Sequence, residues 1–441
     1  MLKRFTVENF LSFQKENILD LTAGTTEVNS GHLVDFQKVK ILKSAVIYGA
    51  NASGKSNVIK AIEYSKEIIL KGLDNVETYK KYFRLNNESP KKPTAFEFEL
   101  EFNGQFFSYG FSSILNTKKV SEEWLYEIGK TTPEMIFERK NNEISLGNIL
   151  INKEIKARFE IYRSDMKNQN SQLFLSEIAN KDLDIKEVEI INTIHNWFDE
   201  KLLILFPNTE FGGKPLISED KDLSETFKKY LNEFDTGIID IKSIEEDFEV
   251  SLKDIPEEIK KDIEKDILKE KAQVSIIQSF NNVFAIYKDN NNLKVHKLGL
   301  VHGQEFKDIF ELEDESDGTR RLFDLIPLIG KFSQDYTIVI DEFDRSLHPK
   351  LTEKFFKLFY QLNHSKTQLI VTIHESTLLN LDLMRRDEIW FVEKERNGNS
   401  TIFSLNQFKN NYDSKLEKAY LLGRYGATPI FKVFDEIDGD N

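Results

Sequence analysis

The sequence predicts an α/β fold with a mainly parallel sheet, an antiparallel β subdomain and a helical insertion. Three observations support this fold class. Short, mainly apolar segments alternate with helices between residues 318 and 393, which is typical of a buried parallel sheet. A glycine-rich loop joins an apolar strand to a helix near residue 50, and two alternating segments flank an Asn-Gly turn at residues 103–104.

The N-terminal elements follow from these patterns. Strands are expected over residues 5–10 and 45–48, and a helix is expected from Lys55 to about residue 70. The segments 96–102 and 105–111 alternate polar and apolar positions on either side of the Asn-Gly turn. This alternation predicts a β-hairpin.

The remaining elements complete the sheet. Residues 150–210 are interpreted mainly as helices, and the segments 282–288 and 293–300 suggest a second hairpin around an Asn-rich turn. From residue 318 the expected order is helix, strand, helix, strand, strand, and the strands cover residues 337–340, 368–373 and 389–393. We therefore expect three regions, namely an N-terminal lobe (1–150), a mainly helical insertion or arm (151–280) and a C-terminal lobe (281–441).

Composition excludes several classes of protein. The 441 residues include 60 Lys+Arg against 74 Asp+Glu, a net charge of −14, whereas a protein that coats nucleic acid normally carries a basic excess. The absence of cysteine excludes disulfide frameworks, thiolate metal sites and cysteine nucleophiles. No apolar run approaches the ~20 residues that span a bilayer, and the N-terminus lacks the apolar stretch of a signal peptide. A cytoplasmic protein without a membrane segment is the simplest expectation.

The acidic charge is concentrated in one block. Residues 218–271 hold eighteen Asp/Glu and ten Lys, a net of −8, whereas residues 1–110 hold fifteen Lys/Arg and thirteen Asp/Glu, a net of +2. Isoleucines recur every four residues within the block, which predicts an amphipathic helix with a narrow apolar stripe. These isoleucines are Ile255, Ile259, Ile263 and Ile267. The block either contacts a partner or forms the water-exposed surface of a helical arm.

The strongest chemical signal is a phosphate-binding loop at residues 49–56. The segment matches the pattern G-x-x-x-x-G-K-[ST], in which glycines let several backbone N–H groups point at one phosphate chain. The Lys55 ammonium would reach the β- and γ-phosphates, and the Ser56 hydroxyl would ligate Mg²⁺. The helix after the loop also favours an anion at its N-terminus. The residues expected to bind the nucleotide here are Gly49, Ala50, Asn51, Ala52, Ser53, Gly54, Lys55, Ser56 and Asn57.

The second signal is the pair Asp341-Glu342, which follows the apolar strand 337–340. Two carboxylates at the end of a buried strand are costly unless they have a chemical role. Asp341 would hold the Mg²⁺ shell, and Glu342 would orient and activate the attacking water. Such a pair alone is more often the start of a helix. Together with the phosphate-binding loop, it favours nucleotide hydrolysis, with Glu342 as the catalytic base.

Three weaker segments define the subclass by their order. Ser316-Asp317-Gly318-Thr319 opens a helix about twenty residues before the Asp-Glu pair and would alone be only a good helix cap. Residues 344–349, Asp-Arg-Ser-Leu-His-Pro, follow the pair directly. His374 lies just beyond the strand 369–373, where a lone histidine is usually a surface residue.

In this order of motifs, the chain resembles the ABC-type ATPase heads of SMC-like and RecF/OLD-like proteins. More closely, it resembles the small ATPases of bacterial abortive-infection and antiphage defence loci, such as AriA of the PARIS system and PtuA of Septu. The matching stretches, which span nearly the whole chain, are residues 10–13, 83–111, 234–238, 315–322, 341–349 and 423–429. The resemblance implies a P-loop NTPase head that binds ATP and Mg²⁺ and hydrolyses ATP.

The resemblance also implies that ATP is sandwiched between two heads, so that the protein is a homo-oligomer containing at least a dimer. Ser316 and the Gly318 N–H of one head would contact the γ-phosphate bound by the other head. His374 would sense the γ-phosphate, and Asp344 and Ser346 would couple the two sites.

The signature segment departs from the Ser-Gly-Gly-Gln pattern of the family at its second and fourth positions. Asp317 beside a triphosphate would be electrostatically costly, so its side chain is expected to point away, and slow turnover is one consequence. The glutamine that ligates Mg²⁺ in such heads has two candidates here, Gln169 and Gln172.

Other differences from the family exclude several of its functional classes. The chain is too short for long coiled coils, and without cysteine it has no zinc hook. Only 67 residues follow His374, too few for an OLD-type nuclease domain, and Asp182 and Asp184 are interpreted as a helix cap. We therefore expect the nucleotide state to hold or release a separately encoded effector in antiphage defence, with a TOPRIM-type nuclease as the candidate.

Two alternatives stay open. One is a RecF-like clamp that closes around DNA in repair when ATP binds, and the other is a nucleotide-held scaffold with negligible hydrolysis. The clamp needs a basic face, although runs of basic residues are usually solvated surface. The residues that would supply this face are Lys80, Lys81, Arg84, Lys91 and Lys92.

Overall fold

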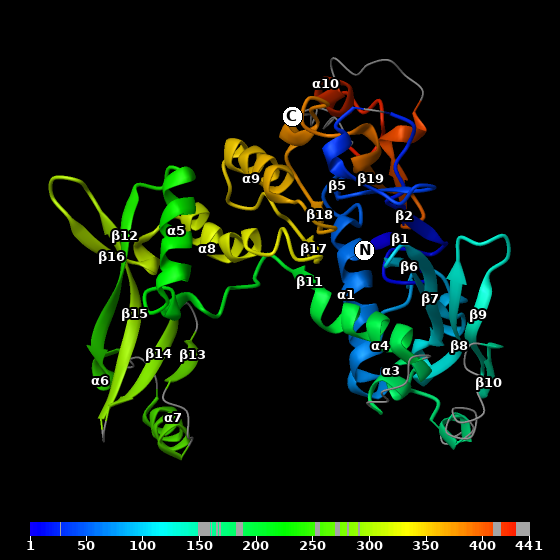
Figure 1. The fold of residues 1–441 in the computed structure, drawn as a ribbon, viewed down its shortest axis with the longest axis horizontal. Helices are drawn as coiled ribbons and strands as arrows, with labels where there is room; N and C mark the ends of the chain where they lie inside the picture. The colour runs from blue at the N-terminus through cyan, green and yellow to red at the C-terminus, as the bar shows by residue number, and fades with distance from the viewer. Residues whose placement is uncertain are drawn as a thin grey trace, which may run out of the picture. The chain divides into compact units, whose positions relative to one another are not determined.

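The chain folds into two compact units, seen in the computed structural model of Figure 1. The first unit comprises Met1–Pro207, Phe332–Asp344 and Thr352–Asn441, and the second comprises Asn208–Lys331 and Arg345–Leu351. The residues that the structure describes are 1–26, 28–148, 159, 161–164, 166, 169–181, 188–251, 256–269, 274–279, 282–289, 292–408 and 416–428.

The first unit contains a six-stranded sheet in the order β11-β17-β18-β5-β19-β20. Its strands are β5 (Ser44–Tyr48), β11 (Leu202–Leu205), β17 (Thr337–Ile340), β18 (Gln368–Thr372), β19 (Ile389–Lys394) and β20 (Ser400–Ser404). All pairings are parallel except that of β20 with β19. Every residue of β5, β17 and β18 is buried, which agrees with their mainly apolar sequences. Because β17, β18 and β5 are adjacent and parallel, their carboxyl ends meet at one edge.

An antiparallel sheet in the order β10-β9-β8-β7-β6-β1-β2 forms the other half of this unit. Its strands are β1 (Leu2–Glu8), β2 (Asn17–Asp20), β6 (Thr94–Phe102), β7 (Gln105–Ile114), β8 (Lys119–Ile128), β9 (Glu134–Lys140) and β10 (Glu143–Leu146); β3 (Leu33–Asp35) and β4 (Lys40–Leu42) form a separate pair. Phe102 pairs with Gln105, and Asn103 and Gly104 have φ values of 51° and 82°. Both turn residues are therefore left-handed, and the predicted Asn-Gly hairpin is confirmed.

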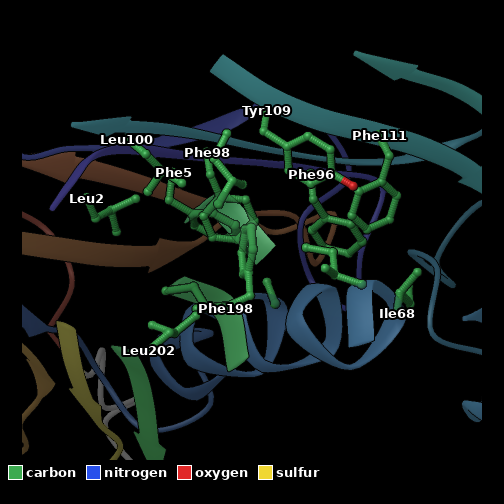
Figure 2. Packing of buried hydrophobic residues seen from close by; sticks show 14 of the residues in the cluster. Leu2, Phe5, Ile68, Phe96, Phe98, Leu100, Tyr109, Phe111, Phe198 and Leu202 are labelled. Carbon is green, nitrogen blue, oxygen red and sulfur yellow. The ribbon is translucent and has the colours of Figure 1, made fainter. Parts of the chain in front are cut away.

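Helix α1 (Lys55–Lys71) packs against the antiparallel sheet through aromatic side chains (Figure 2). The Phe98 ring lies 4.9 Å from the Phe5 ring and 4.9 Å from the Phe198 ring, centroid to centroid. The same buried cluster includes Ile59 of α1 and Ile370 of the parallel sheet. Each fully buried side chain of this kind contributes ~1.5–3 kcal/mol. This core fixes α1, and with it the loop that precedes α1.

The other helices of the first unit are short, except α9. They are α3 (Phe174–Ala179), α4 (Glu189–Asn196), a π-helical turn (Trp197–Lys201), α9 (Pro349–Leu362) and α10 (Leu416–Leu421). Phe355 and Phe359 of α9 pack against Phe332, with ring centroids 5.5 and 5.0 Å apart. In the described part of the chain, each helix is too short or too polar to span a bilayer.

The second unit contains a sheet in the order β12-β15-β14-β13, and β16 also pairs with β15. Its elements are α5 (Lys221–Glu233), β12 (Ile238–Asp247), α6 (Phe248–Ser251), α7 (Glu257–Lys269), β13 (Val274–Ser279), β14 (Asn282–Asp289), β15 (Asn292–His302), β16 (Asp308–Glu311) and α8 (Asp317–Ile329). The antiparallel pairing of β14 with β15 confirms the second predicted hairpin. Helix α7 confirms the helix predicted from the isoleucine spacing; of its described side chains, Ile267 is buried whereas Ile259 is exposed. Ile255 lies outside the described residues.

The predicted domain division is corrected by these units. The second unit spans residues 208–331 rather than 151–280, and it contains a sheet where a mainly helical arm was expected. Strand β12 lies inside the acidic block, and Ile238 and Ile241 are its buried residues. Its remaining positions are partly or fully exposed and many carry charged residues, so the sequence lacks the alternation of apolar and polar residues that predicts a strand. Strand β11 also falls in a region interpreted as helical, because four apolar residues fit either structure.

Candidate functional site

The loop at residues 49–56 connects β5 to α1 in the first unit. A Cβ atom added at Gly49 would lie 2.4 Å from the backbone oxygen of Val392, and one added at Gly54 would lie 2.5 Å from Ser400 Oγ. Gly54 also has a φ of 113°, which side-chain-bearing residues rarely adopt. The glycines of the sequence pattern are therefore required by the path of this loop.

The Lys55 side chain turns back into the loop. Its Nζ atom donates a hydrogen bond to the backbone oxygen of Gly49 at 2.6 Å. Burial lowers the pKa of Lys55, and this effect is opposed by the nearby carboxylates of Asp344, Asp341 and Glu342. The ammonium thus lies in the same electrostatic environment as the acidic residues that follow β17.

The N-terminus of α1 can receive an anion. Its N-cap is Gly54, and no side chain among the described residues caps the first turn. The N–H groups of the first helical turn have no intrahelical partner, and the helix dipole favours negative charge there. With Lys55 beside this turn and the Ser56 hydroxyl half-buried within it, the residues present fit a triphosphate.

Two serines that the sequence interpretation missed as site residues brace the loop. Ser400 Oγ of β20 donates to the backbone oxygen of Ser53 at 2.6 Å, and the Ser400 N–H donates to the backbone oxygen of Ser12 at 2.7 Å. The Asn57 amide, expected to touch nucleotide, donates to Ser12 Oγ at 2.8 Å. Ser12 lies in the matching stretch 10–13, whereas nothing in the sequence around Ser400 marks it.

The carboxylate pair lies at the end of β17. Thr372 Oγ1, on the adjacent strand β18, donates to Asp341 Oδ1 at 2.6 Å and accepts the Glu342 N–H at 2.8 Å. Asp341 and Thr372 are buried, and Glu342 has a φ of 48°, which is uncommon for a residue with a side chain. One hydroxyl therefore orients both acidic residues. A polar residue at the end of the apolar strand β18 was the available sequence signal for it.

His374 is brought to Glu342 by Asp344. Asp344 Oδ2 accepts hydrogen bonds from the His374 N–H at 2.9 Å and the Glu375 N–H at 2.8 Å. His374 Nε2 lies 3.4 Å from Glu342 Oε1, with both side chains partly exposed. The other oxygen, Asp344 Oδ1, is buried without a hydrogen-bond partner in the described part of the chain. Asp344 thus anchors the turn that carries the histidine.

The signature segment lies in the second unit. Ser316 is the N-cap of α8, and its Oγ accepts the Thr319 N–H at 3.1 Å. A Cβ added at Gly318 would lie 2.8 Å from the backbone oxygen of Ser346, so the two predicted segments are neighbours. The Asp317 side chain is largely exposed and forms an ion pair with Arg320.

Neither glutamine candidate lies near the loop. The backbone oxygens of Gln169 and Gln172 accept hydrogen bonds from the Arg139 guanidinium at 3.0 and 2.6 Å. Gln172 Oε1 would lie 2.4 Å from a Cβ at Gly72, the residue that ends α1. At 1.5 Å per residue, that end of the helix is ~24 Å from Ser56. The assignment of Gln169 or Gln172 as a Mg²⁺ ligand is therefore wrong, because Arg139 fixes their segment at the opposite end of α1.

The remaining donors suit Mg²⁺ that is bound together with a nucleotide. Among the described residues, no group of three or more His, Cys, Asp or Glu side chains is arranged to hold a metal ion alone. Mg²⁺ usually binds one or two protein oxygens and completes its shell with phosphate and water. Ser56 and Asp341 offer a hydroxyl and a carboxylate of that kind. Asp182 and Asp184, interpreted as a cap, lie outside the described residues.

The fold and the sequence family define the class of this protein. A parallel sheet with a glycine-rich loop after β5 and a carboxylate pair after β17, joined to an antiparallel β subdomain, has the arrangement of a P-loop nucleotide-binding fold. Residues 44–380, well over half of the chain, match the family described as "AAA domain, putative AbiEii toxin, Type IV TA system". The chain belongs to this family.

Comparison with solved structures returns SMC heads at low similarity. The SMC head domain from Thermotoga maritima is 13% identical, with a TM-score of 0.38, covering 91% of this chain and 98% of that one. An SMC head bound to the C-terminal winged-helix domain of ScpA is 13% identical, with a TM-score of 0.42, covering 91% of this chain and 97% of that one. An SMC head with an extended coiled coil, bound to the C-terminal domain of ScpA and derived from Pyrococcus furiosus, is 14% identical, with a TM-score of 0.41, covering 91% of this chain and 96% of that one. No curated protein sequence matches.

Proposed function

We propose that the protein binds and hydrolyses ATP between two copies of itself and that its nucleotide state controls a separate effector protein. The observation that supports this most strongly is the meeting of three segments at one sheet edge. These are the loop after β5, the Asp341-Glu342 pair after β17 and His374 after β18, with Glu342 and His374 3.4 Å apart.

The loop residues and Lys55 would bind the phosphates. The backbone N–H groups at the start of α1 would donate to the phosphate oxygens, and Lys55 would exchange its bond to the Gly49 carbonyl for one to phosphate. Ser56 and Asp341 would hold Mg²⁺, which neutralises phosphate charge when bound. Thr372 keeps Asp341 directed toward that position through its 2.6 Å hydrogen bond.

Glu342 would accept the proton of the attacking water. Its backbone is held by Thr372, and His374 Nε2 lies beside its carboxylate. His374 would donate a hydrogen bond to the γ-phosphate, and Asp344 would keep the histidine within reach. A general base positioned in this way typically contributes ~10²–10⁴-fold to the rate.

The second copy would complete the site through its signature. Ser316 and the Gly318 N–H, at the N-terminus of α8, would contact the γ-phosphate held by the first copy. The exposed ion pair of Asp317 with Arg320 supports the expectation that Asp317 points away from the nucleotide. Its charge would still weaken closure, which would make turnover slow.

The biological setting proposed is abortive infection or antiphage defence in the cytoplasm. The family description names a type IV toxin–antitoxin system, and the motif order resembles that of AriA and PtuA. We infer that the closed or open dimer holds or releases a separately encoded effector, with a TOPRIM-type nuclease as the candidate. The wholly cysteine-free sequence is compatible with a reducing compartment.

The test is ATP binding and particle mass in purified protein. Wild-type protein should bind ATP and shift to at least a dimer in light scattering, whereas Lys55→Ala should do neither. Lys60→Ala, on the exposed side of α1, is the matched control and should behave as wild type. ATP binding by Lys55→Ala at wild-type affinity would contradict the nucleotide assignment. Co-purification with the product of the neighbouring gene tests the effector.

A further inference from the structure

The hairpin between β15 and β16 is seen in Figure 1. It carries exposed apolar side chains near its tip, together with acidic residues. The Phe306 side chain is 90% exposed, and Ile309 and Phe310 on β16 are 45% and 38% exposed. Gly303, with a φ of 81°, makes the turn, since a Cβ there would lie 2.1 Å from the Phe306 backbone oxygen. Residues 303–311 contain three acidic residues and one Lys, a net of −2, and residues 312–317 add four more acidic residues. We call residues 303–311 the acidic hairpin.

The acidic hairpin is joined directly to the signature. Strand β16 leads through one 3-10 turn, Leu312–Asp314, to Ser316. Glu315, next to Ser316, pairs with His302 at the end of β15, with Nε2 and Oε1 2.5 Å apart. The base of the hairpin and the N-terminus of α8 are therefore held together within the second unit.

The first unit carries a surface of the opposite kind. Tyr79 and Leu85 are 66% and 65% exposed, and Lys80, Arg84 and Lys91 are exposed around them. Residues 79–92 hold five basic residues and one acidic residue, a net of +4. We call residues 79–92 the basic loop. Like the acidic hairpin, it exposes large apolar side chains, but with the opposite charge.

The basic loop borders the phosphate-binding loop. The Leu11 N–H donates to the Lys81 backbone oxygen at 2.8 Å, and the next residue, Ser12, accepts the Asn57 amide. On the other side, a Cβ at Gly398 would lie 2.1 Å from Leu85 Cδ1, and Ser400 two residues later binds the Ser53 carbonyl. Both contacts lie within two residues of the bracing serines.

We propose that the acidic hairpin of one copy docks on the basic loop of a second copy when ATP is sandwiched. This inference rests on the proposed function, in which the signature of one copy meets the phosphate-binding loop of the other. The hairpin is attached to the first of these segments and the basic loop to the second, so closure brings the two surfaces toward each other twice in a two-fold dimer.

A second copy fits these surfaces better than another occupant. Opposite charges steer association and disfavour wrong partners. The apolar side chains of Phe306, Tyr79 and Leu85 supply the surface that is buried from water on contact. Duplex DNA would suit the charge of the basic loop but not that of the acidic hairpin. One occupant that accounts for both surfaces at once is another copy of the chain.

The test uses charge reversal in the Glu342→Gln background with ATP, read as dimer mass by mass photometry. One variant carries Glu305→Lys and Asp308→Lys, and the other carries Arg84→Glu and Lys91→Glu. Each alone should raise the dimer dissociation constant at least about tenfold, because like charges then face each other at both contacts. An equal mixture should recover the dimer, since each hairpin then meets a basic loop of opposite charge.

Matched controls separate this contact from a general effect of charge. The variants Asp262→Lys/Glu264→Lys on α7 and Lys38→Glu/Lys140→Glu on the first unit change the same charge at other exposed positions and should leave the dimer intact. Monomer ATP affinity should be unchanged in every variant. Dimers of wild-type strength in both reversal variants would overturn the docking but not the sandwich.

Two further outcomes would contradict the docking of the acidic hairpin on the basic loop. If the Glu342→Gln parent binds ATP without dimerising, the sandwich itself fails, and the docking fails with it. If the Arg84/Lys91 variant dimerises normally but loses affinity for a short DNA duplex, the basic loop is a nucleic-acid surface and the docking is wrong.

Discussion

The Nε2 atom of His374 lies 3.4 Å from the Oε1 atom of Glu342, although the two residues follow different strands of the parallel sheet. Their strands, β18 and β17, are neighbours, and Asp344 holds the His374 backbone in place. A carboxylate beside an imidazole nitrogen, at the sheet edge that carries the phosphate-binding loop, is suited to accept a proton from water.

Replacing Glu342 by Gln removes the proton acceptor but keeps the size of the side chain. Glu342→Gln should retain ATP affinity, lower kcat by ~10²–10⁴-fold and lengthen the life of the ATP-bound dimer. Phosphate release and particle mass measure these effects. Glu67→Gln, at a half-buried position in the C-terminal half of α1, is the control. Turnover at the wild-type rate in Glu342→Gln would exclude this residue as the base.

Asp344 should act on the rate through His374. Asp344→Ala removes the acceptor of two backbone N–H groups, so the turn that carries His374 loses its anchor. We expect kcat to fall at least about tenfold with a smaller change in KM, since the hydrogen bonds that Asp344 accepts come from the His374 turn and not from the phosphate-binding loop. The double variant with His374→Ala should be no slower than His374→Ala alone. Additive losses would mean that Asp344 does not work through the histidine.

Thr372 should control Mg²⁺ affinity through Asp341. Thr372→Val keeps the shape but deprives the Asp341 carboxylate and the Glu342 N–H of their shared hydroxyl partner. The free energy of unfolding should fall by ~1–3 kcal/mol, and the Mg²⁺ concentration for half-maximal turnover should rise. Thr372→Ser keeps the hydroxyl, so its Mg²⁺ concentration for half-maximal turnover should equal that of the wild type. Its free energy of unfolding should still fall, because the missing methyl group leaves a small cavity. If Thr372→Val and Thr372→Ser needed the same Mg²⁺ concentration for half-maximal turnover, Thr372 would have no role in Mg²⁺ binding.

Much of this site could be predicted because its parts are local in sequence. The glycine pattern at residues 49–56 required a strand before it and a helix after it, and β5 and α1 are those elements. Asp341 and His374 were marked by the apolar strands that precede them. Parallel strands place their carboxyl ends at one edge, so adjacency of β17, β18 and β5 was enough to bring these segments together.

The features that the sequence did not predict depend on tertiary contacts. Gln172 had no local mark that separates a metal ligand from a structural residue, and the buried Arg139 decides its position. Ser400 braces the loop only because β20 pairs beside β19. The sheet of the second unit escaped prediction because β12 is mostly exposed, so that its charged residues resemble those of a solvated helix.

Asp317 should be one cause of slow turnover. It stands second in the signature, where the γ-phosphate of the facing copy would approach in the proposed sandwich, and two unit charges ~4 Å apart in water repel by ~1 kcal/mol. Asp317→Asn removes that charge, so ATP-dependent dimerisation and kcat should both increase several-fold. The exposed pair with Arg320 contributes little, and the free energy of unfolding should change by no more than ~1 kcal/mol. Glu225→Gln breaks a similar exposed (i, i+3) pair with Lys228 on α5 and serves as the control. An unchanged kcat in Asp317→Asn, with dimerisation also unchanged, would assign the slow step to another part of the cycle.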